Sequence, residues 1–151
     1  MRYFDASALV KRYVREPGST RVRRLLSSGS SATSRFSAVE IASALARRAR
    51  EGAFSTDACA RAMASVDADM RAVLVIELTT EVVARAQQLV QRHALRAGDA
   101  VQLASCLFLR DTVDRDVALM AFDDRLNSAA RREGVRLAGE RRARTALRVG
   151  P

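Results

Sequence analysis

The chain opens with MRYFDASALVKRY, residues 1–13, in which a short apolar segment ends at Asp5 and the periodicity of one helix face follows at once. The same change from an apolar strand to a helix recurs along the sequence. Further strands are predicted at 31–34, 73–78, 117–122 and 135–137, and further helices at 22–28, 37–51, 55–70, 80–93, 99–109 and 124–132. Short apolar strands that alternate with helices indicate an α/β fold, a three-layer α/β/α sandwich with a central, mainly parallel sheet.

Length and composition limit the domain organisation. The 151 residues are 48% hydrophobic and 28% charged, which excludes a wholly disordered chain and predicts one domain over 1–137. Residues 138–151 are basic and lack periodicity, so a mobile C-terminal tail is expected there. No apolar run has the length of a membrane span or a signal peptide. Cys59 and Cys106 lie far apart in predicted helices, which favours two free buried thiols and a cytoplasmic protein.

The chain is strongly basic, with a formal net charge of +9. All but one of its 26 Lys and Arg residues are arginine, the exception being Lys11. Positive charge favours an anionic partner, nucleic acid above all, and the guanidinium group suits phosphate. The scarcity of lysine is equally consistent with genomic base composition.

Four carboxylates fall where predicted strands pass into helices. Asp5 and Asp123 follow strands directly, Glu40 lies one turn into a helix, and Asp99 opens a helix that is apolar on nearly every side. The carboxyl ends of parallel strands are where ligands bind in open α/β sheets. Each carboxylate also has a structural explanation: the aspartates fit helix caps, and Ser37 with Glu40 has the spacing of a capping box.

If these carboxylates converge, their mutual repulsion requires that the cluster either takes up protons or binds a cation. Carboxylate oxygens select Mg²⁺ or Mn²⁺. Zinc is disfavoured because His93 is the only histidine and neither cysteine has a ligand-like neighbour. Such an ion would bridge an acidic site to a phosphodiester drawn in by arginine. Ser7 has no evident base partner and is interpreted as a cap or as a hydrogen-bond partner of a metal-bound water.

Four segments together resemble the PIN-domain family, and within it the VapC-type ribonuclease toxins of type II toxin–antitoxin systems. They are YFDASALVK (3–11), AVEI (38–41), LRAGDAVQLA (95–104) and FDDRL (122–126). The resemblance implies a PIN-like fold and an endoribonuclease dependent on Mg²⁺, with Mn²⁺ as a substitute. It implies that Asp5, Glu40, Asp99 and Asp123 hold the metal and that water attacks the RNA phosphodiester, leaving a 5′-phosphate and a 3′-hydroxyl. It also implies a homodimer inhibited by a VapB-type antitoxin.

Three details of the pattern leave alternatives open. Ala121 stands where the family often has Ser or Thr, so one hydroxyl is missing. Asp124 lies beside Asp123, and we assign the metal-facing role to Asp123. Arg35 and Arg96 lie near the second and third acidic positions, where they either hold substrate phosphate or are solvated helix-start residues.

Two other functions are consistent with parts of this pattern. One is a PIN nuclease that processes RNA or acts on DNA without an antitoxin. The other is a basic module that binds nucleic acid without cleaving it, which the complete acidic quartet argues against. The chain has two Tyr, five Phe and no Trp, so limited base stacking is expected and recognition of backbone and shape is favoured.

Overall fold

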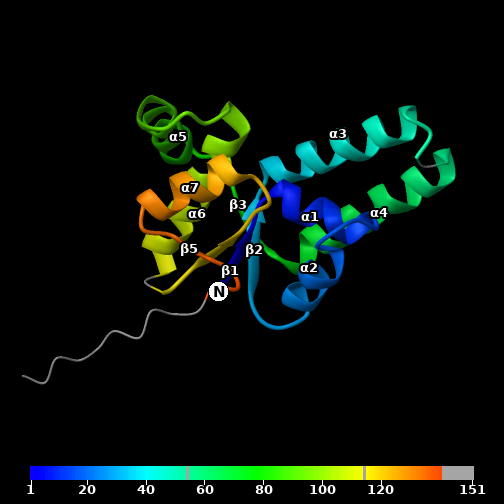
Figure 1. Cartoon of the computed structure of the whole chain (residues 1–151), viewed down its shortest axis with the longest axis horizontal. Coiled ribbons are helices and arrows are strands. Elements are labelled where there is room, and N and C mark those ends of the chain that lie inside the picture. Colours follow the sequence, from blue (N-terminus) through cyan, green and yellow to red (C-terminus); the bar gives the residue numbers. More distant parts are fainter. Residues whose placement is uncertain (54, 114, 141–151) are drawn as a thin grey trace, which may run out of the picture.

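The computed structural model describes residues 1–53, 55–113 and 115–140, and it confirms the predicted three-layer fold (Figure 1). In chain order its elements are β1 (Arg2–Phe4), α1 (Ala6–Tyr13), α2 (Ser19–Leu26), β2 (Ser31–Ser34), α3 (Phe36–Arg50), α4 (Thr56–Ala72), β3 (Leu74–Ile76), α5 (Thr80–Arg92), α6 (Ala97–Val113), β4 (Ala118–Met120), α7 (Asp124–Arg132) and β5 (Arg136–Leu137).

The sheet is parallel throughout, with the strand order β3-β2-β1-β4-β5. Successive strands build outward from β1 through β2 to β3, and the chain then returns to place β4 on the other side of β1. The connections that leave β1 and β4 therefore run in opposite directions. A crevice forms at such a reversal, outside the carboxyl ends of the two strands, and it is the usual ligand position in this class of sheet.

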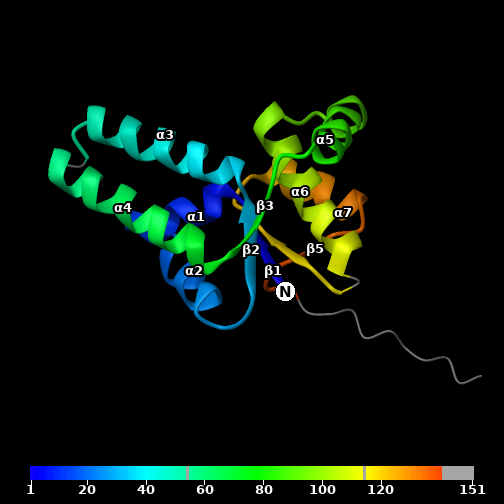
Figure 2. The same cartoon turned by 180° about the vertical axis from the view of Figure 1, so that it is seen from behind.

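Helices cover both faces of the sheet, and each face has its own hydrophobic core. Helices α5, α6 and α7 pack on one face, where Leu89, Leu103 and Leu126 are fully buried. Helices α1 to α4 occupy the other face around Phe4 and Ile41. Seen from behind, the α3–α4 pair extends away from the sheet on the side opposite α5 (Figure 2). The apolar residues that the sequence periodicity identified are thus divided between two cores, one on each face of the sheet.

Some boundaries differ from the prediction. Helix α6 continues to Val113, so the polar loop predicted to begin at Arg110 begins later. The polar residues there lie on the exposed side of the last turn, where they do not interrupt a helix. Cys106 is buried, whereas Cys59 is only half-buried, and both are free thiols.

The chain remains packed just beyond the predicted end of the domain. Ala138 is buried, its backbone N–H donates to Leu119 O, and its carbonyl oxygen accepts from Arg21. Of the predicted basic tail 138–151, residues 141–151 lie outside the described residues. Among the helices of the described ranges, none combines the length and apolar character needed to cross a membrane.

Candidate active site

The topological reversal brings Asp5 and Asp123 to neighbouring strand ends. Asp5 follows β1 and its backbone N–H donates to Met120 O at the end of β4, at 3.1 Å. Asp123 follows β4 after two intervening residues, Ala121 and Phe122. Both side chains also cap the helices that follow, since Asp5 accepts from Ala8 N and Asp123 accepts from Leu126 N. Capping and placement at the crevice are therefore compatible roles of the same side chains.

Asp5 is the most deeply placed of the four carboxylates, with 4% of the residue exposed. Burial raises its pKa from 3.8 to about 7, the negative charge of Glu40 adds to the rise, and hydrogen bonds from Ala8 and Ser7 oppose it. Ser7 Oγ lies 2.9 and 2.8 Å from the two carboxylate oxygens and accepts a hydrogen bond from Phe122 N. The hydroxyl of Ser7 therefore contacts Asp5 itself and ties it to the loop before Asp123.

Glu40 reaches the same edge of the sheet from α3, and Gln102 holds it. Gln102 Nε2 donates to Glu40 Oε2 at 2.6 Å and to Ser37 Oγ at 2.9 Å, while its Oε1 accepts from Tyr3 Oη at 2.7 Å. Ser37 does not cap α3, because its hydroxyl is engaged with Gln102 and Thr33. The capping-box explanation of Glu40 is therefore not what this structure shows.

Asp99 lies in the first turn of α6, half-buried. Burial raises its pKa, and the negative charge of Asp123 raises it further, while Arg96 and Arg125 act in the opposite direction. Burial likewise raises the pKa of Glu40, with a contribution from the charge of Asp99. The carboxylate whose charge raises the pKa of Asp99 is therefore Asp123. The neighbouring Asp124 is exposed to solvent.

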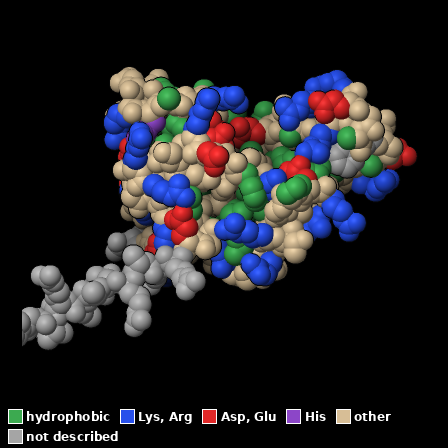
Figure 3. Space-filling view, viewed as in Figure 1, with side chains coloured by type: hydrophobic (Ala, Val, Ile, Leu, Met, Phe, Trp, Pro, Cys, Tyr) green, Lys and Arg blue, Asp and Glu red, His purple; other side chains and the backbone are tan. Residues whose placement is uncertain are grey.

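The four predicted carboxylates therefore form one electrostatic series, in which each charge acts on the next: Asp5, Glu40, Asp99 and Asp123. Acidic side chains gather near the middle of one face of the molecule, beside α7, with Lys and Arg side chains around them (Figure 3). A set of carboxylates with no thiolate or imidazole suits a hard cation. Within the described ranges, however, no three His, Cys, Asp or Glu side chains are placed to hold a metal ion together.

The two arginines predicted to hold phosphate differ in their surroundings. Arg35 forms a two-pronged ion pair with Glu77, at 2.6 Å between Nη2 and Oε1, so its guanidinium group is already engaged. Arg96 is exposed, its backbone donates to Asp99, and its charge stabilises that carboxylate. Of the two, Arg96 is therefore the one placed beside the acidic residues.

Sequence reasoning missed three residues that shape this site. Gln102 is buried in a helix described only as apolar, and it orients Glu40. Gly98 lies so close to Glu40 that a Cβ there would stand 2.8 Å from Oε1. Arg125 acts electrostatically on Asp99 from α7. A polar residue one turn after Asp99 on an apolar helix was the available signal for Gln102, whereas the other two depend on how helices meet in space.

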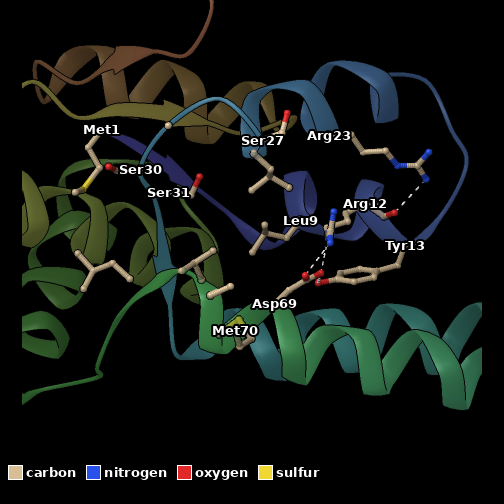
Figure 4. A pocket seen from close by; sticks show the side chains of 15 residues that line it. Met1, Leu9, Arg12, Tyr13, Arg23, Ser27, Ser30, Ser31, Asp69 and Met70 are labelled. Atoms are coloured by element: carbon tan, nitrogen blue, oxygen red, sulfur yellow. Dashed lines mark hydrogen bonds and ion pairs between the residues drawn. The ribbon is translucent and has the colours of Figure 1, made fainter.

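A separate pocket of about 670 Å³ lies at the opposite end of the strands (Figure 4). Ser31 and Leu74, at the starts of β2 and β3, belong to its lining. On its wall Asp69 accepts hydrogen bonds from Tyr13 and pairs with Arg12, linking α1 to α4. None of the predicted site residues lines this pocket, so it is distinct from the acidic site.

Comparison with known proteins identifies the family. The PIN-domain family model matches residues 2–132, and the chain therefore belongs to the PIN-domain family. Two curated relatives are the ribonucleases VapC45 and VapC49, from two Mycobacterium tuberculosis strains, CDC 1551 / Oshkosh and ATCC 25618 / H37Rv respectively. Each is 36% identical over 137 residues, which cover 90% of this chain and 93% of the relative. The predicted resemblance to VapC-type PIN toxins is confirmed.

Two solved structures support the fold. One is VapC20 of Mycobacterium tuberculosis, described as a sarcin-ricin loop cleaving toxin, with a TM-score of 0.64 at 20% identity over 85% of this chain and 95% of that one. The other is a toxin–antitoxin complex from Klebsiella pneumoniae, with a TM-score of 0.59 at 14% identity over 82% of this chain and 87% of that one. At such identities the likeness concerns the architecture alone.

Proposed function

We propose that this chain is an endoribonuclease dependent on Mg²⁺ or Mn²⁺, and the toxin of a VapBC-type toxin–antitoxin pair. One observation supports the proposal: Asp5 and Asp123 follow the neighbouring strands β1 and β4 at the reversal point of a parallel sheet. Glu40 and Asp99 lie close enough for the carboxylate charges to act on one another in pairs. A negatively charged site repels phosphate, yet the chain as a whole has a net charge of +9. A divalent cation between the carboxylates and an RNA phosphodiester accounts for both features.

The four carboxylates Asp5, Glu40, Asp99 and Asp123 would hold the cation in their deprotonated state. When bound, the cation supplies a water of lowered pKa and neutralises charge on the phosphate. Ser7 keeps Asp5 oriented, and Gln102 keeps Glu40 oriented, because each side chain donates to a carboxylate oxygen. Hydrogen bonds that hold the metal-binding carboxylates in place preserve their geometry and contribute to metal affinity.

Substrate approach depends on the cationic side chains around the acidic residues. Arg96 and Arg125 both act on Asp99, so a phosphate bound beside Asp99 would meet two positive charges. Water would attack the phosphorus and the P–O3′ bond would break, so that O3′ leaves as a 3′-hydroxyl and the phosphate remains on the 5′ side, as the family resemblance implies. We propose Arg96 as a phosphate contact and leave Arg35 out of this role, because Glu77 already neutralises it.

The relatives support two of the proposed partners. Two VapC ribonucleases at 36% identity and a toxin–antitoxin complex of the same fold support a VapB-type antitoxin as the inhibitor and RNA as the substrate. We propose that the chain acts as a homodimer in the cytoplasm, where its RNA substrate is. The test is expression of the chain with and without the adjacent small open reading frame. Growth arrest that the neighbouring protein fails to relieve would contradict the toxin assignment.

The catalytic proposal has its own test. Purified protein is incubated with total cellular RNA and Mn²⁺, with and without EDTA, and the ends of the products are mapped. Cleavage is expected to need the cation, to leave 5′-phosphate ends and to be lost in Asp123→Asn. The neighbouring exposed Asp124→Asn is the matched control and is expected to retain cleavage. Activity that survives both EDTA and Asp123→Asn would refute the mechanism, and DNA cleavage in place of RNA cleavage would refute the substrate.

A further inference from the structure

Phe122 lies at the rim of the acidic site with part of its ring in solvent. It directly precedes Asp123, and its backbone N–H donates to Ser7 Oγ, the hydroxyl that contacts the Asp5 carboxylate. The residue is 38% exposed although it is large and apolar. Two hydrogen bonds therefore separate its backbone from the most buried carboxylate of the site, while the ring remains accessible.

The ring is held in one orientation from the α1 side. Lys11 Nζ lies 4.3 Å from the ring centroid, within the range of a cation–π interaction. Lys11 is itself fixed by Glu16 at 2.7 Å, and Glu16 also pairs with Arg48 of α3. The only lysine of the chain therefore contacts the aromatic ring as part of an ion-pair network that joins two helices.

Gly18 completes the support for the ring. Its backbone has φ +94°, a conformation that favours glycine, and a Cβ at this position would lie 2.7 Å from both Cε1 and Cζ of Phe122. The absence of a side chain at Gly18 thus leaves the space that the ring edge occupies. A ring fixed by Lys11 and Gly18 loses little conformational freedom when its exposed part meets a ligand.

We propose that Phe122 stacks on an unpaired base of the RNA beside the scissile phosphodiester, so that the site takes a single-stranded segment. This inference rests on the proposed ribonuclease function. Every base offers a π-face, but the bases of a duplex are already stacked on one another, so an exposed ring selects unpaired nucleotides. The low aromatic content still argues against extensive stacking, so only one base is expected to stack on the protein.

The test uses the absence of tryptophan from the chain. In an Asp99→Asn background that binds RNA without cleaving it, Phe122→Trp introduces the only tryptophan. Its fluorescence is recorded during titration with a labelled single-stranded oligoribonucleotide of mixed sequence, and with the same strand annealed to its complement. Anisotropy of the label reports binding independently. Thr112→Trp, exposed near the far end of α6 from Asp99, is the matched control.

We expect the single strand to quench the tryptophan at 122, with little quenching by the duplex and none at 112. Without the added tryptophan, Phe122→Leu is expected to lower affinity for the single strand about tenfold, whereas Phe122→Tyr retains it. Binding seen by anisotropy without quenching, or equal affinity of the Leu and Tyr variants, overturns the stacking role and leaves the ribonuclease proposal standing. Failure of the wild-type chain to cleave RNA with Mn²⁺ would instead refute the ribonuclease proposal.

Discussion

The side-chain amide of Gln102 donates to Glu40 Oε2 at 2.6 Å from inside the protein core. The same amide donates to Ser37 and accepts from the hydroxyl of Tyr3, so one buried side chain satisfies three others. Tyr3 belongs to β1 and Glu40 to α3, while Gln102 belongs to α6. Gln102 therefore links Glu40, on one face of the sheet, to strand β1 and to helix α6 on the opposite face.

Replacing Gln102 by Leu is expected to lower both stability and activity. The change leaves the Tyr3 hydroxyl without its acceptor and Glu40 without its donor, so we expect a loss of about 2 kcal/mol in the free energy of unfolding. The freed Glu40 carboxylate should lower RNA cleavage by about tenfold or more. Urea denaturation and Mn²⁺-dependent cleavage measure the two effects. Gln91→Leu, at an exposed position of α5, is the control, and equal losses in both variants would contradict this role.

The burial of Asp5 predicts an unusual dependence of stability on pH. Because its pKa is about 7 in the folded protein and 3.8 ordinarily, the folded state retains a proton that the unfolded state has released between these values. The contribution of Asp5 to the stability of the metal-free protein is therefore fully present below about pH 4 and is lost as the pH rises through 7, by on the order of 4 kcal/mol. The raised pKa values of Glu40 and Asp99 act in the same direction.

Urea denaturation at a series of pH values in EDTA measures this dependence. Asp5→Asn carries no titrating group at this position, so much of the loss between pH 4 and 7 should disappear. Asp57→Asn, at an exposed position of α4, should leave the dependence unchanged. An equal pH dependence in the wild-type chain and in Asp5→Asn would show that Asp5 is ionised in the metal-free fold.

The sequence pattern predicted the fold well because its main signal is local. Short apolar segments typical of strands alternate along the chain with segments of helical periodicity. This alternation alone indicates parallel strands with helices on both faces. The strand order is a different matter, since nothing local in residues 117–122 shows that β4 pairs with β1. That pairing creates the reversal beside Asp5, and it joins two strands that are far apart in the sequence.

The sequence predicted the charged residues of the site more completely than the residues that hold them in position. Carboxylates at strand ends were recognisable because their positions follow from sheet geometry. The hydrogen bond between Gln102 and Glu40 joins residues 62 positions apart, so no spacing rule anticipates it. The same reason explains Arg35, which was expected near phosphate and is paired with Glu77 from the end of the neighbouring strand.

Ser7 is expected to act through Asp5 rather than as a nucleophile. Ser7→Ala removes a donor to the carboxylate and the acceptor of the Phe122 N–H, so the free energy of unfolding should fall by about 1 kcal/mol. Since this hydrogen bond lowers the pKa of Asp5, its loss should move the acidic limb of the pH–rate profile to higher pH. Activity should persist above that limb, and Ser7→Thr should restore the profile. Ser43→Ala, exposed on α3, is the control, and complete inactivity of Ser7→Ala at every pH would favour a nucleophile.

Gly98→Ala should separate activity from stability. Alanine in place of glycine ordinarily stabilises a helix by about 1 kcal/mol, and Gly98 lies in the first turn of α6. Its Cβ would stand 2.8 Å from Glu40 Oε1, which is the end of a flexible side chain, so the carboxylate moves aside while the helix remains. We expect unchanged or slightly higher stability together with about a tenfold loss of Mn²⁺-dependent cleavage, measured by urea denaturation and product mapping.

Gly52→Ala is the control for the replacement of a glycine outside the site. A Cβ at Gly52 meets no atom, but the φ of +74° disfavours alanine, so stability should fall while cleavage persists. Full cleavage by Gly98→Ala would show that the position of the Glu40 carboxylate does not limit the reaction.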